Sequence, residues 1–557
     1  MTGAMSAPHD NSPWPWAPTL PPAGSPWRRR APRLRAAGYA VLFVALATVC
    51  VQFHARTARR VAKARRVDQA FLKTQAAHAA EPTEANRLAA LSAAEAVITV
   101  KRRQGAIPRW TVAVRQFWKG VNIYRSMPGQ GAGDPLTGER RVGAPQAAPT
   151  PPVCLDATPA ELIERPVFLH PNMPFVVIAL TPVAYLSAQA MVAAVNLLKI
   201  AALLAAIMWT AAAVNHRGHR MGEWVIGLAV LLALPNLISD FQHANTNVFV
   251  LAAIAAHLAL YRRGRDGWAG VALAGAICLK MTPALFAVYW LYQRNWRLLG
   301  GLAGSLAAMV VLVPLTVLGW GRYDAMMGAW LGNLIVPGLL KGAPYPIHIN
   351  QSLSGVFTRL FMHANIHYNP DDVAVAEKFA YINIASLSPA AGRAILVALK
   401  AALVAVMAWA IGWRRLARDD GRRGLHYGLI VSAMMIANQR TWDHHAAVLL
   451  IAYAALWYAL AYGLMPRGRR IGALAALGVA GAIVFVTGKS LFVALGGGGE
   501  RGKQFAAVVE AWGPTFVHFV IIWVLCVVCL RALRSDGRVY APDRQTLRAG
   551  RHGAERR

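Results

Sequence analysis

Four short stretches of the chain hold most of the residues whose types can do chemistry. They cover residues 109–124, 240–247, 350–355 and 438–445, and together they carry carboxylates, imidazoles, amides, guanidinium groups and indoles. Carboxylates and imidazoles transfer protons, whereas guanidinium and ammonium groups stabilise negative charge. The residue types therefore predict proton transfer and anion binding.

Each stretch also has a plainer interpretation. Asp240 can cap the helix that starts near Asn245. His444 and His445 can belong to an aromatic belt beside Trp442. Because polar residues near a membrane are costly and tend to be functional, the four stretches taken together favour one shared site.

A metal site is the first specific alternative. His444 and His445 are adjacent, so on a helix they point about 100° apart and do not easily bind one ion. Asp240 and His243 are three residues apart and can do so, but no third ligand follows at a suitable spacing. We expect no metal.

Composition defines the elements that must position these stretches. Of 557 residues, 56% are hydrophobic and 15% charged, against about 25% charged in soluble domains. Continuous apolar runs long enough to cross about 30 Å of hydrocarbon recur along the chain, which indicates helices rather than a barrel. We predict an all-α, polytopic transmembrane helical bundle with about ten full spans and one or two re-entrant or partial helices.

The net charge of +33 comes mostly from short loops between apolar runs. Positive-inside bias and anionic lipid explain this pattern, so we expect a bilayer and no nucleic acid as partner. Four of the five cysteines lie in apolar runs, which excludes a disulfide framework.

The chain divides into five regions. We expect a disordered cytoplasmic tail over 1–36, a first transmembrane helix over 37–53, a long extracytoplasmic loop over 54–171, a multi-span membrane domain over 172–532 with an extracytoplasmic loop over 321–390, and a basic cytoplasmic tail over 533–557. This organisation is that of a multi-pass cell-membrane protein with both termini in the cytoplasm.

Basic clusters set the topology. Placing six of them in the cytoplasm puts the four polar stretches on the other side of the membrane. The run 267–292 is basic at both ends and contains Lys280 and Pro283 at its centre, where the proline breaks the helix. It is therefore predicted to form a re-entrant hairpin with a buried tip. The clusters are His216–Arg220, Arg262–Arg265, Arg294–Arg297, Arg414–Arg423, Arg467–Arg470 and Arg531–Arg538.

Several of these stretches match a known family in order. They are Trp118–Tyr124, Asp240–Phe249, Tyr261–Asp266 with Lys280–Phe286 and Tyr289, Asn350–Leu353, and Trp442–His445. Over roughly residues 105–465 the chain resembles glycosyltransferase family 87, which belongs to the GT-C superfamily. Each motif is short, and the order of the set gives the signal its specificity.

The resemblance implies a GT-C-like fold and a polyprenyl-phosphate sugar as donor. The expected reaction moves a hexose or pentose, mannose-like, to an extracytoplasmic glycan or glycolipid acceptor with inversion. The lipid-linked sugar is then a substrate, and no cofactor is needed.

One departure concerns the base. Family members carry an aspartate in the first extracytoplasmic loop, but residues 104–115 contain no acid and the nearest upstream carboxylate is Glu95. The acceptor hydroxyl must still lose its proton. Asp240 is our first candidate base, and the other catalytic candidates are His243, His444, His445 and Glu95.

Further residues are candidates for substrate binding. Cations suit the departing lipid phosphate, and indoles can stack on sugar rings. The set is Arg109, Trp110, Arg115, Asn245, Asn247, Lys280, Asn350, Gln351, Arg440, Trp442 and Asp443.

Two other functions stay open at this point. One is a multi-span transporter or lipid-linked-sugar flippase, although transporters tend to show matched broken helices in repeated halves and only one broken run is seen here. The other is a catalytically inactive GT-C-like scaffold, which the missing first-loop acid would explain.

Overall fold

The structure is a computed structural model that describes residues 26–102, 106–124, 136–137, 139, 155–156, 172–217, 219–369, 378–487 and 489–534. Every regular element in these ranges is a helix, apart from one isolated bridge between His216 and His219. The predicted all-α class is confirmed for this part of the chain.

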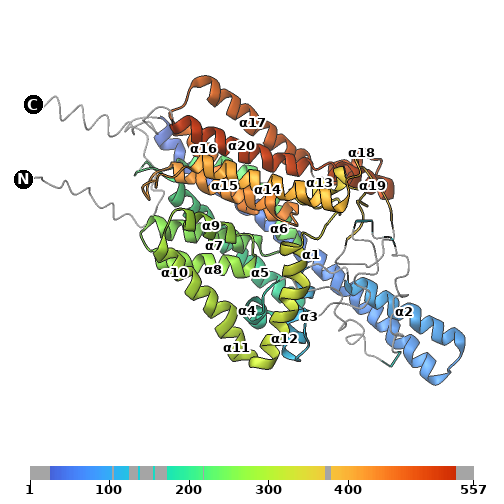
Figure 1. Ribbon diagram of the computed structural model, residues 1–557. Coiled ribbons are helices and arrows are strands. Elements are labelled where there is room, and N and C mark those ends of the chain that lie inside the picture. Colours follow the sequence, from blue (N-terminus) through green and yellow to red (C-terminus); the bar gives the residue numbers. More distant parts are fainter. Residues whose placement is uncertain are drawn as a thin grey trace, which may run out of the picture.

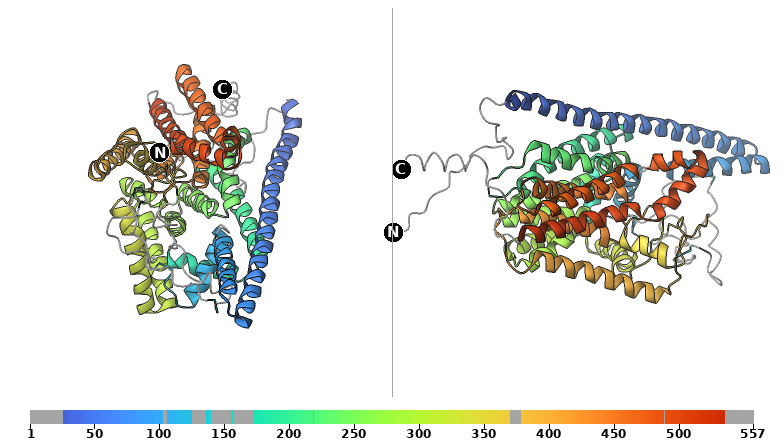
Figure 2. Two further views of the ribbon diagram at one scale, coloured as in Figure 1. Left: turned by 90° about the vertical axis from the view of Figure 1, so that its right-hand side faces the viewer. Right: turned by 90° about the horizontal axis from the view of Figure 1, so that it is seen from above.

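The N-terminal part is a long helix with a second helix packed on its far end. α1 has 55 residues, so it is about 80 Å long at about 1.5 Å per residue. The predicted first transmembrane helix and the basic segment after it therefore form one continuous helix, which runs past the bundle (Figure 2). Phe71 of α1 is buried against Ala94 and Val97 of α2. The helices are α1 (Pro26–Ala80), α2 (Glu84–Arg102) and α3 (Ala106–Trp118).

The bundle follows in two parts (Figure 1). The first contains α4 (Pro174–Ala184), α5 (Ala188–Val214), α6 (Glu223–His243), α7 (Asn247–Arg262), α8 (Asp266–Leu279), α9 (Ala284–Tyr292), α10 (Trp296–Leu306), the π-helix η2 (Ala307–Leu312), α11 (Val313–Leu318), α12 (Trp320–Trp330), the π-helix η3 (Leu331–Leu340) and α13 (Leu353–Phe361). The second contains α14 (Pro389–Ile411), α15 (Arg422–Ala437), the 3₁₀ helix η4 (Asp443–Leu449), α16 (Leu450–Tyr462), α17 (Arg467–Val486), α18 (Lys489–Leu495), α19 (Gly499–Ala511) and α20 (Pro514–Arg534).

Nearly all residues of α15 and α16 are buried, so these two helices form the centre of the bundle. Helices buried all round read as apolar on every face, which explains their lack of a polar stripe. Their neighbours α5, α6 and α20 contribute to the same core.

Seven helical stretches in the described ranges are long and apolar enough to cross a membrane. They are Ala188–Val214, Glu223–His243, Trp296–Leu318, Pro389–Ile411, Asp443–Tyr462, Arg467–Val486 and Gly499–Leu533. The predicted total of about ten full spans stays a prediction, because length and composition select only these seven.

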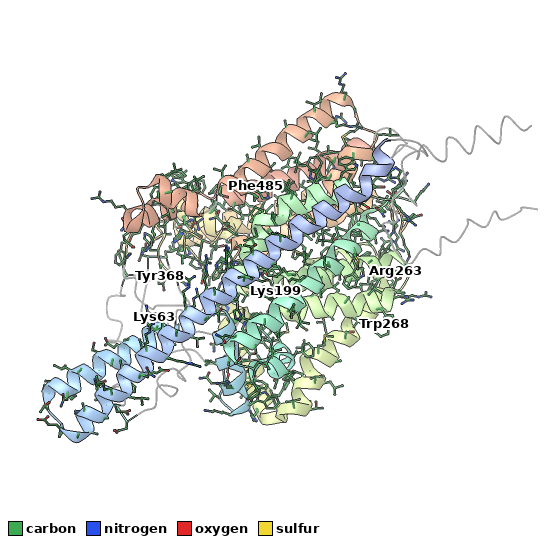
Figure 3. The ribbon with its side chains drawn as sticks, turned by 180° about the vertical axis from the view of Figure 1, so that it is seen from behind. Lys63, Lys199, Arg263, Trp268, Tyr368 and Phe485 are labelled. Carbon is green, nitrogen blue, oxygen red and sulfur yellow. The ribbon has the colours of Figure 1, made fainter. Side chains whose placement is uncertain are left out.

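The basic clusters gather at one end of the bundle. Arg418 binds Asp266 at 2.7 Å, and Arg415 donates to the carbonyl of Arg294 at 3.3 Å. The backbone N–H of Arg217 donates to Asp419 O at 2.8 Å. In Figure 3, Arg263 and Trp268 lie at this end, Tyr368 lies toward the other end, and Lys199 lies between them. The sequence grouping of these clusters is therefore matched in space.

The predicted break in the run 267–292 is confirmed. α8 ends at Leu279 and α9 begins at Ala284, with Pro283 in the gap. Tyr289 of α9 accepts from Arg423 at 3.0 Å, so both helices return to the arginine-rich end. At about 1.5 Å per residue, 14 and 9 residues span about 21 Å and 14 Å, too little to cross about 30 Å of hydrocarbon. Re-entry into a bilayer stays a prediction.

Close helix contact fixes this hairpin against α10. A Cβ on Gly270 would lie 2.4 Å from the carbonyl oxygen of Leu298, and one on Gly301 would lie 2.5 Å from that of Gly267. The two backbones touch because neither glycine carries a side chain. This contact explains the place of Gly270 among the family-like residues.

We predict that Gly270→Ala lowers the unfolding temperature in detergent and that Gly275→Ala does not. Gly275 lies on the same helix but has no atom within 4 Å of its Cβ position. Overpacking costs about 1–3 kcal/mol, and the better helix propensity of alanine offsets only about 1 kcal/mol of it. Equal unfolding temperatures for the two variants would contradict the contact.

Candidate functional site

The turn between α6 and α7 closes on the carboxylate of Asp240. Ala244 has a φ of 52°, in the left-handed region, and reverses the chain. The reversal lets Asn247 donate to Asp240 Oδ1 twice, from its backbone N–H at 3.2 Å and from its side-chain amide at 2.9 Å. Asp240 therefore points into the protein.

Lys199 of α5 forms an ion pair with Asp240 inside the bundle (Figure 3). Its Nζ lies 2.7 Å from Asp240 Oδ2 and 2.9 Å from the backbone oxygen of the same residue. Both side chains have 0% exposure. A buried charge is tolerated only when it is paired, so this contact joins α5 firmly to α6.

Asn247 passes the connection on to Lys280 at the break between α8 and α9. Lys280 Nζ donates to Asn247 Oδ1 at 2.8 Å. Asn172 holds the residue before it, donating to Leu279 O at 3.0 Å. We call Lys199, Asp240, Asn247 and Lys280 the charge cluster. It holds two ammonium groups and one carboxylate, and such an excess of positive charge suits an anion.

The segment 438–445, which we call the histidine loop, lies beside the charge cluster. Asn245 and His444 make a hydrogen bond between Nδ2 and Nε2 at 2.8 Å. The rings of His243 and His444 stack with centroids 5.0 Å apart. Lys280 interacts electrostatically with both His444 and His445. Two of the four predicted stretches, together with the hairpin tip, are therefore brought together.

Polar atoms at this place remain without a partner. Trp442 Nε1 and Thr282 Oγ1 are buried and have no hydrogen-bond partner among the described residues. Trp442 stacks on His445 with ring centroids 6.0 Å apart, and its backbone N–H donates to His445 Nδ1 at 3.3 Å. Buried polar groups are rarely left unsatisfied in a protein, so these atoms mark a place for a polar ligand.

The third stretch, around Asn350, binds the backbone of the histidine loop. Asn350 donates from Nδ2 to Gln439 O at 3.0 Å and accepts at Oδ1 from Thr441 N at 2.9 Å. Ser352 Oγ donates to Gln439 O at 3.2 Å, and Gln351 N donates to Thr441 O at 2.6 Å. We call Asn350 and Ser352 the loop clamp, because their side chains hold the loop rather than face a ligand.

A family comparison decides what this arrangement belongs to. Residues 168–437 match the model of glycosyltransferase family 87. The resemblance predicted from the motifs is confirmed, over a narrower range than the motifs cover. No curated protein and no solved structure gives a significant match. The family and the apolar helices make the chain a membrane glycosyltransferase.

The family match includes the charge cluster and the loop clamp. It ends one residue before the histidine loop. Contacts from Asn245 and Asn350 nevertheless tie that loop to matched residues. The structure thus joins to the family region a segment that the match leaves out.

Several family-like residues lie at the opposite, arginine-rich end. Asp266 binds Arg418, and Tyr289 accepts from Arg423. The guanidinium of Arg418 also lies 4.7 Å from the ring centre of Tyr261. These residues hold the loop before α15 in place, so their role is structural.

The first-loop candidates lie apart from the charge cluster. Glu95 is exposed on α2, which packs against α1, and Arg115 is exposed on α3. Trp110 is only 8% exposed and packs with Phe53 and Met191. The side chain of Arg109 falls outside the described residues. None of the four has a printed bond to the charge cluster, and their substrate roles stay predictions.

Arg440 and Asp443 complete the histidine loop. The guanidinium of Arg440 lies 4.1 Å from the ring centre of Tyr345, and Asp443 is exposed at the start of η4. Among the described residues, no group of three or more His, Cys, Asp or Glu side chains is arranged to hold a metal ion.

Two buried cations were missed by the sequence reasoning. Lys199 stands in a long apolar helix, where a lone lysine is itself a signal of function or pairing. Arg359 is fully buried and donates to the carbonyls of Ala511 and Asn350, both at 2.9 Å. Burial lowers the pKa of Arg359 and Glu510 opposes this shift. No sequence pattern marked Arg359.

We predict that Asn350→Ala loosens the histidine loop. The variant removes four buried hydrogen bonds and leaves backbone groups of residues 439 and 441 without partners, at about 1–3 kcal/mol. Hydrogen exchange of residues 438–449 should accelerate by about tenfold or more, since about 1.4 kcal/mol is a factor of ten. Asn383→Ala is the control, because Asn383 bonds only to residues 385 and 386. Unchanged exchange in Asn350→Ala would contradict the clamp.

A second prediction concerns the buried ion pair. Asp240→Asn should lower the unfolding free energy by about 3–5 kcal/mol, because it leaves the Lys199 charge unpaired. Adding Lys199→Met should recover most of that loss. Equilibrium unfolding in detergent measures the coupling in a double-mutant cycle. Losses that simply add would show that the two charges do not depend on each other.

Proposed function

We propose that this membrane glycosyltransferase moves a mannose-like hexose or a pentose from a polyprenyl-phosphate donor to a glycan or glycolipid acceptor, with inversion. The reaction takes place on the extracytoplasmic side of the cell membrane, and both termini are cytoplasmic. The observation that carries the proposal is Lys280, which lies at a helix break beside the histidine loop.

Lys280 suits the donor phosphate for electrostatic reasons. The carboxylate of Asp240 is already paired with Lys199, so the positive charge of Lys280 is not neutralised by a direct ion pair. Negative charge develops on the phosphate as the bond to the sugar breaks. A fixed cation in a water-poor site stabilises that charge more in the transition state than in the bound donor.

The neighbouring groups supply donors for the same ligand. Thr282 Oγ1 and Trp442 Nε1 are buried near the two ends of this arrangement and have hydrogens to donate. Imidazoles of His444 and His445 lie between the cluster and the loop. The apolar helix faces around them suit the polyprenyl chain.

Inversion follows from a single displacement. The acceptor oxygen bonds to the anomeric carbon on the face opposite the phosphate, and the bond from that carbon to the phosphate oxygen breaks. The electron pair stays on the polyprenyl phosphate, and the proton of the acceptor hydroxyl goes to a base. No nucleotide is involved, in keeping with the absence of a glycine-rich nucleotide motif in the sequence.

The test is transfer by purified protein from synthetic, radiolabelled mannosyl and arabinosyl polyprenyl phosphates to a membrane glycolipid extract. We expect labelled product and release of polyprenyl phosphate. Lys280→Met should lower kcat by about 10²–10³-fold, as for loss of one transition-state donor. Lys400→Met, on the partly exposed side of α14, should stay near wild type.

Other outcomes separate the alternatives. Transfer from a nucleotide sugar instead would refute the polyprenyl donor. Movement of the intact donor across a liposome membrane, without transfer, would favour the transporter or flippase. A protein that binds the donor but neither transfers nor moves it would favour the inactive scaffold.

A further inference from the structure

The reaction needs a base, and the structure narrows the choice. Two carboxylates in the described part of the chain belong to the elements that form the charge cluster and the histidine loop. They are Asp240 and Asp443. The inference below rests on the proposed transferase function.

Asp240 is poorly placed to accept the proton. It is fully buried, its Oδ2 faces Lys199 and its Oδ1 takes two bonds from Asn247. A carboxylate held by an ammonium group and two amide donors is stabilised in its charged form, and so it is a weak base. An acceptor hydroxyl would also have to enter the ion pair to reach it.

Asp443 differs on each of these points. Its side chain is exposed, at the first position of η4, between Trp442 and His444. His444 is fixed to Asn245, and His444 and His445 both interact with Lys280. Asp443 therefore stands at the solvent-facing edge of the same site, with the anion-binding charge further in.

The loop clamp gives Asp443 a fixed position. Asn350, Gln351 and Ser352 bind residues 439 and 441, just ahead of it. The hydrogen bond from Trp442 N to His445 Nδ1 then starts η4. A base acts efficiently only when it is held in place, and the backbone on both sides of Asp443 is held.

Other acids near this end are occupied or distant. Glu510 bonds to His348 Nδ1 at 2.7 Å, and Glu500 bonds to Lys378 at 2.8 Å and Lys503 at 3.2 Å. Glu95 is on α2, which packs against α1.

We propose that Asp443 is the general base and replaces the acid that the first loop lacks. Its carboxylate takes the proton of the acceptor hydroxyl as that oxygen attacks the anomeric carbon. The carbon–oxygen bond to the donor phosphate breaks in the same step, and the electron pair leaves on the phosphate beside Lys280. The protonated Asp443 then loses its proton to water.

The test measures donor-to-acceptor transfer by the full chain with the variants Asp443→Asn and Asp443→Ala. We expect kcat to fall by about 10²–10⁴-fold, the usual contribution of a general base, with little change in donor KM. Formate should restore part of the activity of Asp443→Ala, because it supplies a carboxylate in the vacated space. Asp443→Ala should also lose the acidic limb of the kcat–pH profile.

Asp324→Asn is the matched control, since Asp324 is exposed on α12 and has no bond to the histidine loop. It should keep wild-type kcat and gain nothing from formate. An Asp443→Ala protein within threefold of wild type would overturn the proposal. So would a loss of activity with an unchanged pH profile and no response to formate, since that is the signature of a structural role.

The two proposals fail in different ways. A wild-type protein that does not transfer from any polyprenyl donor fails the proposed function. An active wild type with an active Asp443→Ala fails only the assignment of the base.

Discussion

A single buried ion pair organises the outer half of the bundle. Lys199 and Asp240 face each other at 2.7 Å without exposure to solvent. Neither charge tolerates separation from the other in such surroundings, so α5 and α6 must keep their register. Asn247 extends the constraint to α7, and Lys280 extends it to the break between α8 and α9. Four elements are thus positioned by one unbroken series of polar contacts.

The ends of the bundle have different chemistry. At the arginine-rich end, guanidinium groups bind carboxylates, carbonyls and tyrosine rings, as Arg418 and Arg423 do. At the other end, amides bind backbone, as Asn350 does, and two histidines remain beside an ammonium group. The first set fixes loops. The second fixes a loop and also leaves buried donors without partners.

The sequence predicted the elements better than their contacts. Apolar run length and the position of Pro283 were sufficient for the helical class and for the break at Lys280, because both depend on local backbone chemistry. The grouping of basic clusters followed from a rule that acts on each loop separately. Pairing across the chain has no such local signal. The partner of Asn350 is 89 residues away in Gln439, and that of Lys199 is 41 residues away in Asp240. Asp240 was therefore placed at the right turn, while its burial against a lysine was not foreseen.

The length of α1 determines how the N-terminal hairpin moves. α1 continues from the bundle for 27 residues beyond Phe53, or about 40 Å at about 1.5 Å per residue, without a break before Ala80 (Figure 2). A helix of this kind acts as a lever, because a small change of its angle in the bilayer becomes a large displacement at its tip. Transmembrane helices change tilt with hydrocarbon thickness. The position of α2 above the membrane surface is thus coupled to the lipid composition of the bilayer.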